Sequence, residues 1–171
     1  SRELRPGDVV SLDFGVASGG MHGDSAVAVV GGEGDEEKRR LLEISRQSLD
    51  DAMQVMLPGH RLSDIGHRLQ TTVEAAGFSV VRDFAGHGIG RAMHEPPWIP
   101  NYGQPGRGPR LLPGMVFAIE PMVTMGGPEV RLLDDEWTAV TADGSLAAHF
   151  EHTILITEHG PEVLTRIEGS H

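Results

Sequence analysis

Residues 9–30, with the sequence VVSLDFGVASGGMHGDSAVAVV, contain two runs of apolar and β-branched residues separated by four small residues. Such runs favour strands, so residues 9–16 and 21–30 are predicted to form two of them. The Ala-Ser-Gly-Gly sequence at 17–20 favours a tight turn. The stretch therefore predicts an antiparallel hairpin.

The register of this hairpin decides where its two aspartates lie. A turn centred between Ser18 and Gly19 would place Asp13 directly opposite Asp24 on one face. Directly opposed side chains have Cβ atoms about 5 Å apart, and two like charges at that distance are destabilising unless something neutralises them. A bound cation would do so. In the alternative, one aspartate caps the turn or both face solvent.

Two amphipathic helices are expected after the hairpin. Residues 36–57 repeat apolar side chains at helical spacing and end before Pro58, which cannot continue a helix. Residues 64–76 repeat the pattern, with Ser63 as the predicted N-cap and Gly77 as the C-terminal stop.

The rest of the chain predicts short strands and one long loop. Strands are expected at 78–84, 115–120, 137–141 and 150–157, whereas the Gly- and Pro-rich stretch 86–113 predicts an irregular segment. Two helices over a mostly antiparallel sheet define an α+β fold.

Composition limits the possible partners. The 171 residues, 39% of them apolar, fit a single globular domain spanning 1–168, and 169–171 resembles a tag remnant. A net charge of -11 argues against nucleic acid and anionic membrane, because both require clustered Lys and Arg. The chain has no cysteine, which leaves any transition metal to oxygen and imidazole ligands and fits a cytoplasmic location.

Three further residues are candidate metal ligands. His87 is flanked by glycines that let the backbone approach closely, Glu120 ends the apolar run 115–119, and Glu151 lies beside the apolar run 154–156. A carboxylate that is buried with an apolar strand needs a cation or a hydrogen-bond donor beside it.

Together with the two aspartates, these residues offer a charge of about -4, which two divalent ions would balance. Oxygen donors with one imidazole suit Mn, Fe, Co or Zn without selecting among them. Two such ions can activate a bridging water for peptide hydrolysis.

Several motifs occur in a fixed order along the chain. They are Asp13 and Asp24 separated by ten residues, Gly86-His87-Gly88-Ile89-Gly90-Arg91, His94-Glu95-Pro96, Ile119-Glu120-Pro121, Trp137-Thr138 and Phe150-Glu151-His152-Thr153. From about residue 4 to 165 the chain resembles the type I methionine aminopeptidases.

The resemblance implies a pita-bread fold, a curved antiparallel sheet covered by helices, with its first half incomplete because the family's N-terminal segment precedes the position of Arg5. It also implies that Asp13 chelates one metal ion, that Asp24 and Glu151 bridge two, and that His87 and Glu120 complete the second site. Glu120 would in addition be the general acid/base.

The resemblance assigns substrate contacts as well. His94 matches a histidine that contacts the scissile peptide, and Trp137 matches an indole that lines the methionine pocket. Met93 stands where an aromatic residue is usual, and its thioether still suits a methionine side chain. His149 replaces a more usual glutamine and adds a titrating group near the metal ligands.

The implied function is removal of the initiator methionine from nascent chains with a small second residue. Nascent polypeptide N-termini would be the substrate and the ribosome a further partner, and the complete fold is expected to be a monomer. The alternatives are an X-Pro aminopeptidase of the same fold, which Trp137 and residues 99–102 disfavour, and a pita-bread binding module or truncated fragment without activity.

Overall fold

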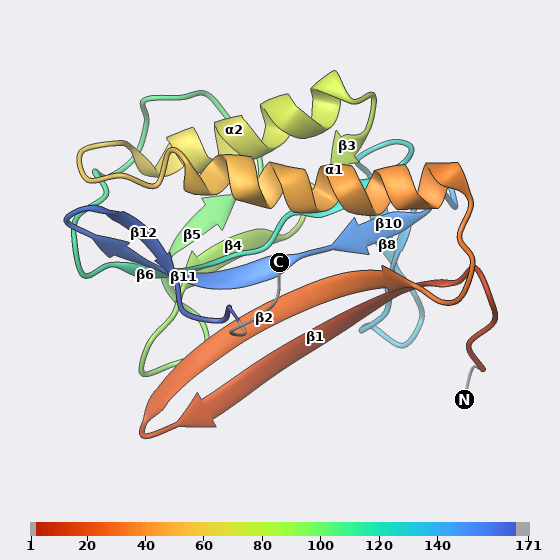
Figure 1. The fold of residues 1–171 in the computed structure, drawn as a ribbon, viewed down its shortest axis with the longest axis horizontal. Coiled ribbons are helices and arrows are strands. Elements are labelled where there is room, and N and C mark those ends of the chain that lie inside the picture. Colours follow the sequence, from red (N-terminus) through yellow and green to blue (C-terminus); the bar gives the residue numbers. More distant parts are fainter. Residues whose placement is uncertain (1–2, 167–171) are drawn as a thin grey trace.

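Two helices lie across one face of an antiparallel sheet in the computed structural model, which describes residues 3–166 (Figure 1). Within those residues the main sheet contains seven strands in the order β1-β2-β11-β6-β4-β5, with β12 paired to β11. The strands are β1 (Val9–Ser18), β2 (Met21–Val30), β4 (Ala85–Gly88), β5 (Glu95–Pro100), β6 (Val116–Ile119), β11 (Glu151–Thr157) and β12 (Gly160–Val163). The pairings are antiparallel, so the predicted α+β class is confirmed. The expected tag remnant at 169–171 lies outside the described residues.

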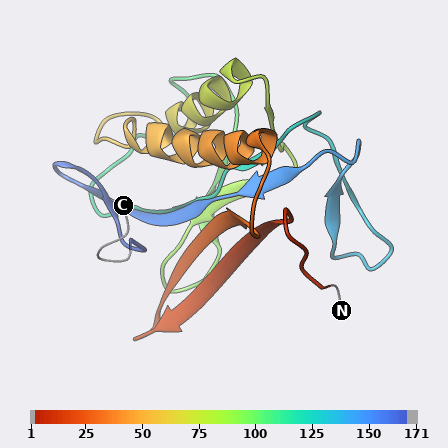
Figure 2. The same ribbon diagram turned by 45° about the vertical axis from the view of Figure 1, so that its right-hand side comes forward.

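Two smaller sheets flank the main one. One has the order β10-β7-β3, and the other is a hairpin of β8 and β9 that stands away from the main sheet (Figure 2). Their bounds are β3 (Ser79–Val80), β7 (Met122–Thr124), β8 (Val130–Leu132), β9 (Ala139–Thr141) and β10 (Ala147–His149).

The two predicted helices are present as α1 (Glu36–Met53) and α2 (Leu62–Ala75). Asp35 caps α1 by accepting a hydrogen bond from the Lys38 N–H at 2.9 Å. The predicted Ser63 cap is wrong, because α2 begins two residues earlier than predicted, with Arg61 at the N-cap, and the Ser63 hydroxyl donates to the Arg107 carbonyl instead.

The core lies between the helices and the sheet. Apolar side chains from one face of each helix meet side chains from β6 and β11, all nearly inaccessible to solvent: Leu41, Leu49, Ile65, Leu69, Phe117, Ile119, Ile154 and Ile156. Burying one such side chain stabilises a fold by about 1.5–3 kcal/mol. This packing fixes the positions of β6 and β11. It therefore also fixes the side chains on the opposite face of each strand.

The segment 86–113, predicted to be irregular, contains most of β4 and all of β5. The prolines that argued against strand structure, Pro96, Pro97 and Pro100, lie in β5, the edge strand of the main sheet. An edge strand tolerates proline because one side of it carries no ladder hydrogen bonds. Conversely, the strand predicted at 78–84 shortens to Ser79–Val80.

The hairpin register differs from the predicted one. Ser18 pairs with Met21, so the turn residues are Gly19 and Gly20, with φ of 59° and 80°. A two-residue turn of this type requires positive φ at both positions, which glycine adopts without strain. Asp13 therefore pairs with Ala26 rather than with Asp24.

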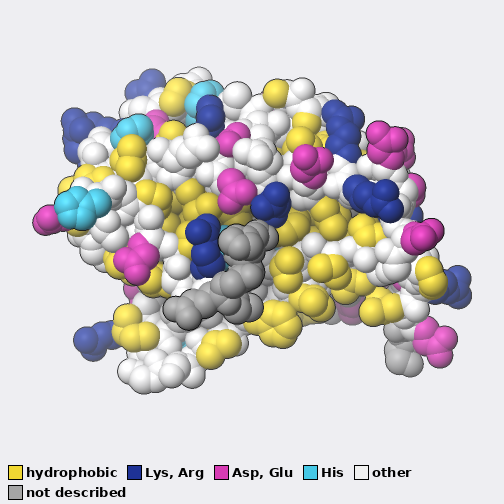
Figure 3. Space-filling view, in the orientation of Figure 1, with side chains coloured by type: hydrophobic (Ala, Val, Ile, Leu, Met, Phe, Trp, Pro, Cys, Tyr) yellow, Lys and Arg dark blue, Asp and Glu magenta, His cyan; other side chains and the backbone are white. Residues whose placement is uncertain are grey.

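The outer face of the hairpin is apolar and open. Its large side chains are 41–59% exposed: Leu12, Phe14, Val16, Val27 and Val29. Figure 3 shows hydrophobic side chains gathered below the helices, over this hairpin. Contiguous apolar surface of this kind commonly marks a contact with another polypeptide segment. Within residues 3–166 neither helix combines the length and the apolar character that a membrane crossing requires.

Candidate metal centre

The strand order of the main sheet brings the five predicted ligands together. They occupy neighbouring strands: Asp13 on β1, Asp24 on β2, Glu151 on β11, Glu120 directly after β6, and His87 on β4. Residues separated by more than a hundred positions in the chain thus face one region of one sheet.

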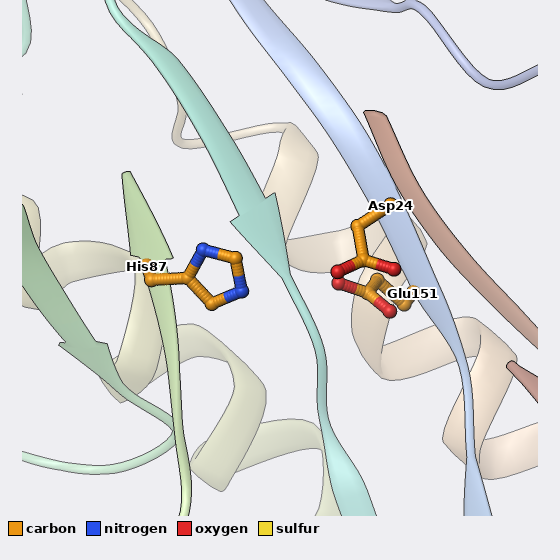
Figure 4. Close-up of side chains that lie close together, drawn as sticks. All are labelled: Asp24, His87 and Glu151. Atoms are coloured by element: carbon orange, nitrogen blue, oxygen red, sulfur yellow. The ribbon is translucent and has the colours of Figure 1, made fainter. Parts of the chain in front are cut away.

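Three of these side chains meet closely. One ligand atom from each of Asp24, His87 and Glu151 lies within 4.8 Å of the other two. In Figure 4 the carboxylates of Asp24 and Glu151 lie side by side and the His87 ring points toward them. His87 and Glu151 are each only 2% exposed. Two carboxylates and an imidazole in this arrangement form a donor set for a divalent cation.

Glu120 and Asp13 lie beside this group and differ in their exposure. The Oε1 of Glu120 lies 3.5 Å from the Nε2 of His87, and its side chain is 14% exposed. Asp13 lies at the open edge with its side chain 57% exposed. The structure therefore joins three of the predicted ligands into a compact group, with Glu120 in contact with it and Asp13 at its rim.

His87 is fixed by its backbone surroundings. A Cβ at Gly86 would lie 2.5 Å from the Ala118 carbonyl oxygen, and one at Gly88 would lie 2.5 Å from that of Pro96. Only glycine allows β4 to approach both neighbours so closely. The Nδ1 of His87 lies 2.9 Å from the Gly88 carbonyl, which can only accept, so Nδ1 carries the hydrogen. Nε2 then presents its lone pair to the carboxylates.

Asp24 is held to β11 by Thr153. The Asp24 N–H donates to the Thr153 hydroxyl, which in turn donates to the Asp24 carbonyl, both at 2.8 Å. Glu120 is held in a comparable way, since the buried Asn101 side chain donates to its carbonyl at 3.1 Å. These bonds fix the strand positions from which the acidic side chains project.

The electrostatics of the cluster favour a cation. Burial, followed by repulsion from Glu120, Asp24 and Asp13, raises the pKa of Glu151 to about 9. Burial and the two aspartates raise the pKa of Glu120 to about 8, and burial raises that of Asp24. The Oε1 of Glu151 is buried without a hydrogen-bond partner among the described residues. An orphaned oxygen among mutually repelling carboxylates fits a divalent ion.

His149 lies beside the cluster, as expected. Its Nδ1 is 4.0 Å from the Oδ2 of Asp13 and its Nε2 is 3.9 Å from the Oε2 of Glu120. Burial lowers the pKa of its imidazole. At neutral pH the ring is therefore uncharged and adds no positive charge to the carboxylates.

A groove of about 580 Å³ opens beside His87 and Glu120. It is also lined by His94 and by residues that sequence reasoning did not single out: Asp83, Phe84, Ala85, Trp98 and Met122. Trp98 is identified as a groove residue by the pairing of β4 with β5, which places it opposite His87. That pairing cannot be read from local sequence.

The two remaining predicted substrate contacts lie elsewhere. A Cβ built on Gly15 would lie 3.6 Å from the Met93 Sδ and 3.9 Å from the Asp24 Oδ1, so Met93 packs on the hairpin next to Asp24. Trp137 is 88% exposed in the connection between β8 and β9. It does not line the groove.

Comparison with known proteins accords with this geometry. The model of metallopeptidase family M24 matches residues 1–158. A methionine aminopeptidase of Clostridium perfringens is 52% identical over 98% of this chain and 68% of its own length. The crystal structure of the Thermotoga maritima methionine aminopeptidase superposes with a TM-score of 0.94 at 52% identity, covering 96% of this chain and 66% of that one. A Pyrococcus furiosus prolidase superposes at 0.76 with 25% identity, covering 98% of this chain and 44% of the prolidase. The chain thus spans about two-thirds of the length of the aminopeptidases that it matches.

Proposed function

Because the chain belongs to metallopeptidase family M24, we propose that it carries the metal centre of an aminopeptidase that removes N-terminal methionine. The observation that carries this proposal is the buried group of Asp24, His87 and Glu151 with Glu120 beside it. The names of the relatives at about half identity support methionine as the residue released. The substrate would then be the N-terminus of a nascent polypeptide, met in the cytoplasm and at the ribosome.

Five side chains would hold two divalent ions. On the resemblance, Asp24 and Glu151 would be shared by the two ions, His87 and Glu120 would belong to one of them, and Asp13 would belong to the other. Mn, Fe, Co and Zn all suit this donor set. When bound, such ions polarise a carbonyl and lower the pKa of a bound water.

Glu120 is suited to move a proton. Its carboxylate lies between the buried His87 and the open groove, so it can reach both the metal ligands and a bound peptide. General acid/base work requires a group that holds a proton near neutral pH and can release it. A carboxylate that contacts His87 and also lines the groove is suited to such transfer.

Other residues would orient the peptide. His94 lines the groove with its ring centroid 4.4 Å from that of His87, within reach of the scissile amide. Met93 packs beside Asp24 on the hairpin side of the centre, where it would contact the methionine side chain. We assign Trp137 to the same pocket on the resemblance alone.

The likeness to prolidase concerns the fold shared by the family. Two proteins named methionine aminopeptidase are 52% identical to this chain, against 25% for the prolidase. The higher identity favours methionine release over cleavage of X-Pro peptides.

The test is hydrolysis of Met-Ala-Ser by the metal-free chain and after addition of Mn(II), Co(II), Fe(II) or Zn(II). Leu-Ala-Ser, Lys-Ala-Ser and Met-Pro-Ser serve as substrate controls. Glu120→Gln is the matched variant, because it keeps the shape of the side chain and removes its proton transfer. We expect metal-dependent release of methionine by the wild type and its loss in the variant. Tight metal binding without methionine release would contradict the proposal.

A further inference from the structure

Trp98 is placed beside the metal centre by strand pairing. On β5 it lies directly opposite His87 of β4, and cross-strand partners project from the same face of a sheet. The Trp98 ring centroid is 6.4 Å from the ring centroids of both His87 and His94. The indole is nevertheless 62% exposed, so its surface is available to a ligand.

The groove and Met93 occupy different parts of the site. Met93 packs on the hairpin beside Asp24. The groove is not lined by Met93; its lining includes His87, Glu120, Phe84, Met122 and the exposed Asp83. A peptide with its first residue on the hairpin side would therefore extend into this groove beyond the scissile bond.

Spacing along the peptide selects the residue that meets the indole. Consecutive Cα atoms are about 3.8 Å apart, and alternate side chains of an extended chain lie about 7 Å apart on one side. With the scissile amide beside His94, the second residue of the substrate lies next to the histidines. The third residue lies at the distance of Trp98.

We propose that Trp98 is a specificity-determining residue that binds the side chain of the third substrate residue and selects apolar and aromatic side chains there. Phe84 and Met122 supply the remaining apolar surface of the groove. Asp83 at its rim disfavours an acidic third residue. The inference rests on the proposed function, since it takes the orientation of the substrate from it.

The experiment compares Met-Ala-X-Ser peptides in which X is Phe, Leu, Gly or Glu. The wild type should cleave the Phe and Leu peptides with a kcat/KM about 5-fold above that for Gly, as expected for one aromatic contact, and Glu should be the poorest. Trp98→Ala should abolish the preference by raising KM for Phe and Leu while kcat and the Gly peptide are unaffected. Trp98→Phe should restore most of it. Leu112→Ala is the control, because Leu112 is 53% exposed and lies outside the groove. An unchanged Phe-to-Gly ratio in Trp98→Ala would overturn the inference.

A binding measurement distinguishes failure of this inference from failure of the proposed function. Calorimetry with the product peptides Ala-Phe-Ser and Ala-Gly-Ser needs no turnover. If no methionine is released from any peptide, weaker binding of Ala-Phe-Ser to Trp98→Ala than to wild type would still support the groove. Equal binding of Ala-Phe-Ser to both proteins would overturn the inference whatever the activity.

Discussion

Loading of the metal centre should release about two protons at pH 7. In the metal-free protein, Glu120 and Glu151 have pKa values of about 8 and about 9. At pH 7 such groups are about 90% and about 99% protonated. A carboxylate must be deprotonated to bind a metal ion, so the incoming cation displaces both protons.

The pH dependence of this release follows from the same values. At pH 9 the group with a pKa of about 8 is about 10% protonated and the one with a pKa of about 9 is half protonated. Proton release should therefore fall below about one per protein. The apparent affinity for metal should rise steeply up to about pH 8, more slowly near pH 9, and level off above about pH 10.

Calorimetric titration with Mn(II) or Zn(II) in buffers of different ionisation enthalpy measures the released protons directly. Glu120→Gln should lower the release at pH 7 by about one proton, because an amide carries none to displace. Glu162→Gln, at an exposed glutamate of β12, should leave it unchanged. Release near zero at pH 7 in the wild type would refute the burial and repulsion argument, since both glutamates would then already be ionised.

Three further predictions concern stability. Burial raises the folded-state pKa of both glutamates above the unfolded value. The stability that these two groups contribute to the metal-free protein is therefore fully present below about pH 4.5 and is lost as the pH rises to 8–9. Urea unfolding between pH 5 and 9 should show this fall, and saturating metal should remove it. Gly86→Ala should destabilise the fold by about 2 kcal/mol or more in urea unfolding, because its Cβ would meet the Ala118 carbonyl at 2.5 Å, whereas Gly23→Ala, with nothing within 4 Å, should be nearly neutral. Thr153→Val should cost about 1–3 kcal/mol and weaken metal binding, because both hydrogen bonds to Asp24 are lost; unchanged metal affinity would mean that Thr153 does not position Asp24.

The hairpin shows how a wrong register can still lead to a correct site. The predicted turn centre between Ser18 and Gly19 is one residue early, because the two glycines at 19 and 20 supply the positive φ angles of the turn. Moving the centre by one residue shifts each pairing by two positions. A shift of two leaves each side chain on its original face. Asp13 and Asp24 therefore remain on one face but lie diagonally, and Asp13 stays at the rim.

The groove shows what the sequence could not predict. His87, Glu120 and Glu151 each carry a local signal, a glycine pair or an adjoining apolar strand. Trp98 carries none, because its position depends on pairing between β4 and an edge strand rich in proline. The long-range pairings of antiparallel strands are set by the whole sheet, which local propensity does not encode.

Strand β11 explains why a charged cluster is tolerated in this fold. Glu151 and Thr153 face the metal centre, while Ile154 and Ile156 pack under the helices, and each of the four is no more than 2% exposed. The apolar contacts on the helix side hold the strand in place, so Glu151 cannot escape to water without disrupting the core. Its burial cost must instead be offset at the site, by a proton in the absence of metal and by a divalent cation in its presence. The same packing that opposes a charge on Glu151 thus makes it a strong ligand once a cation is available.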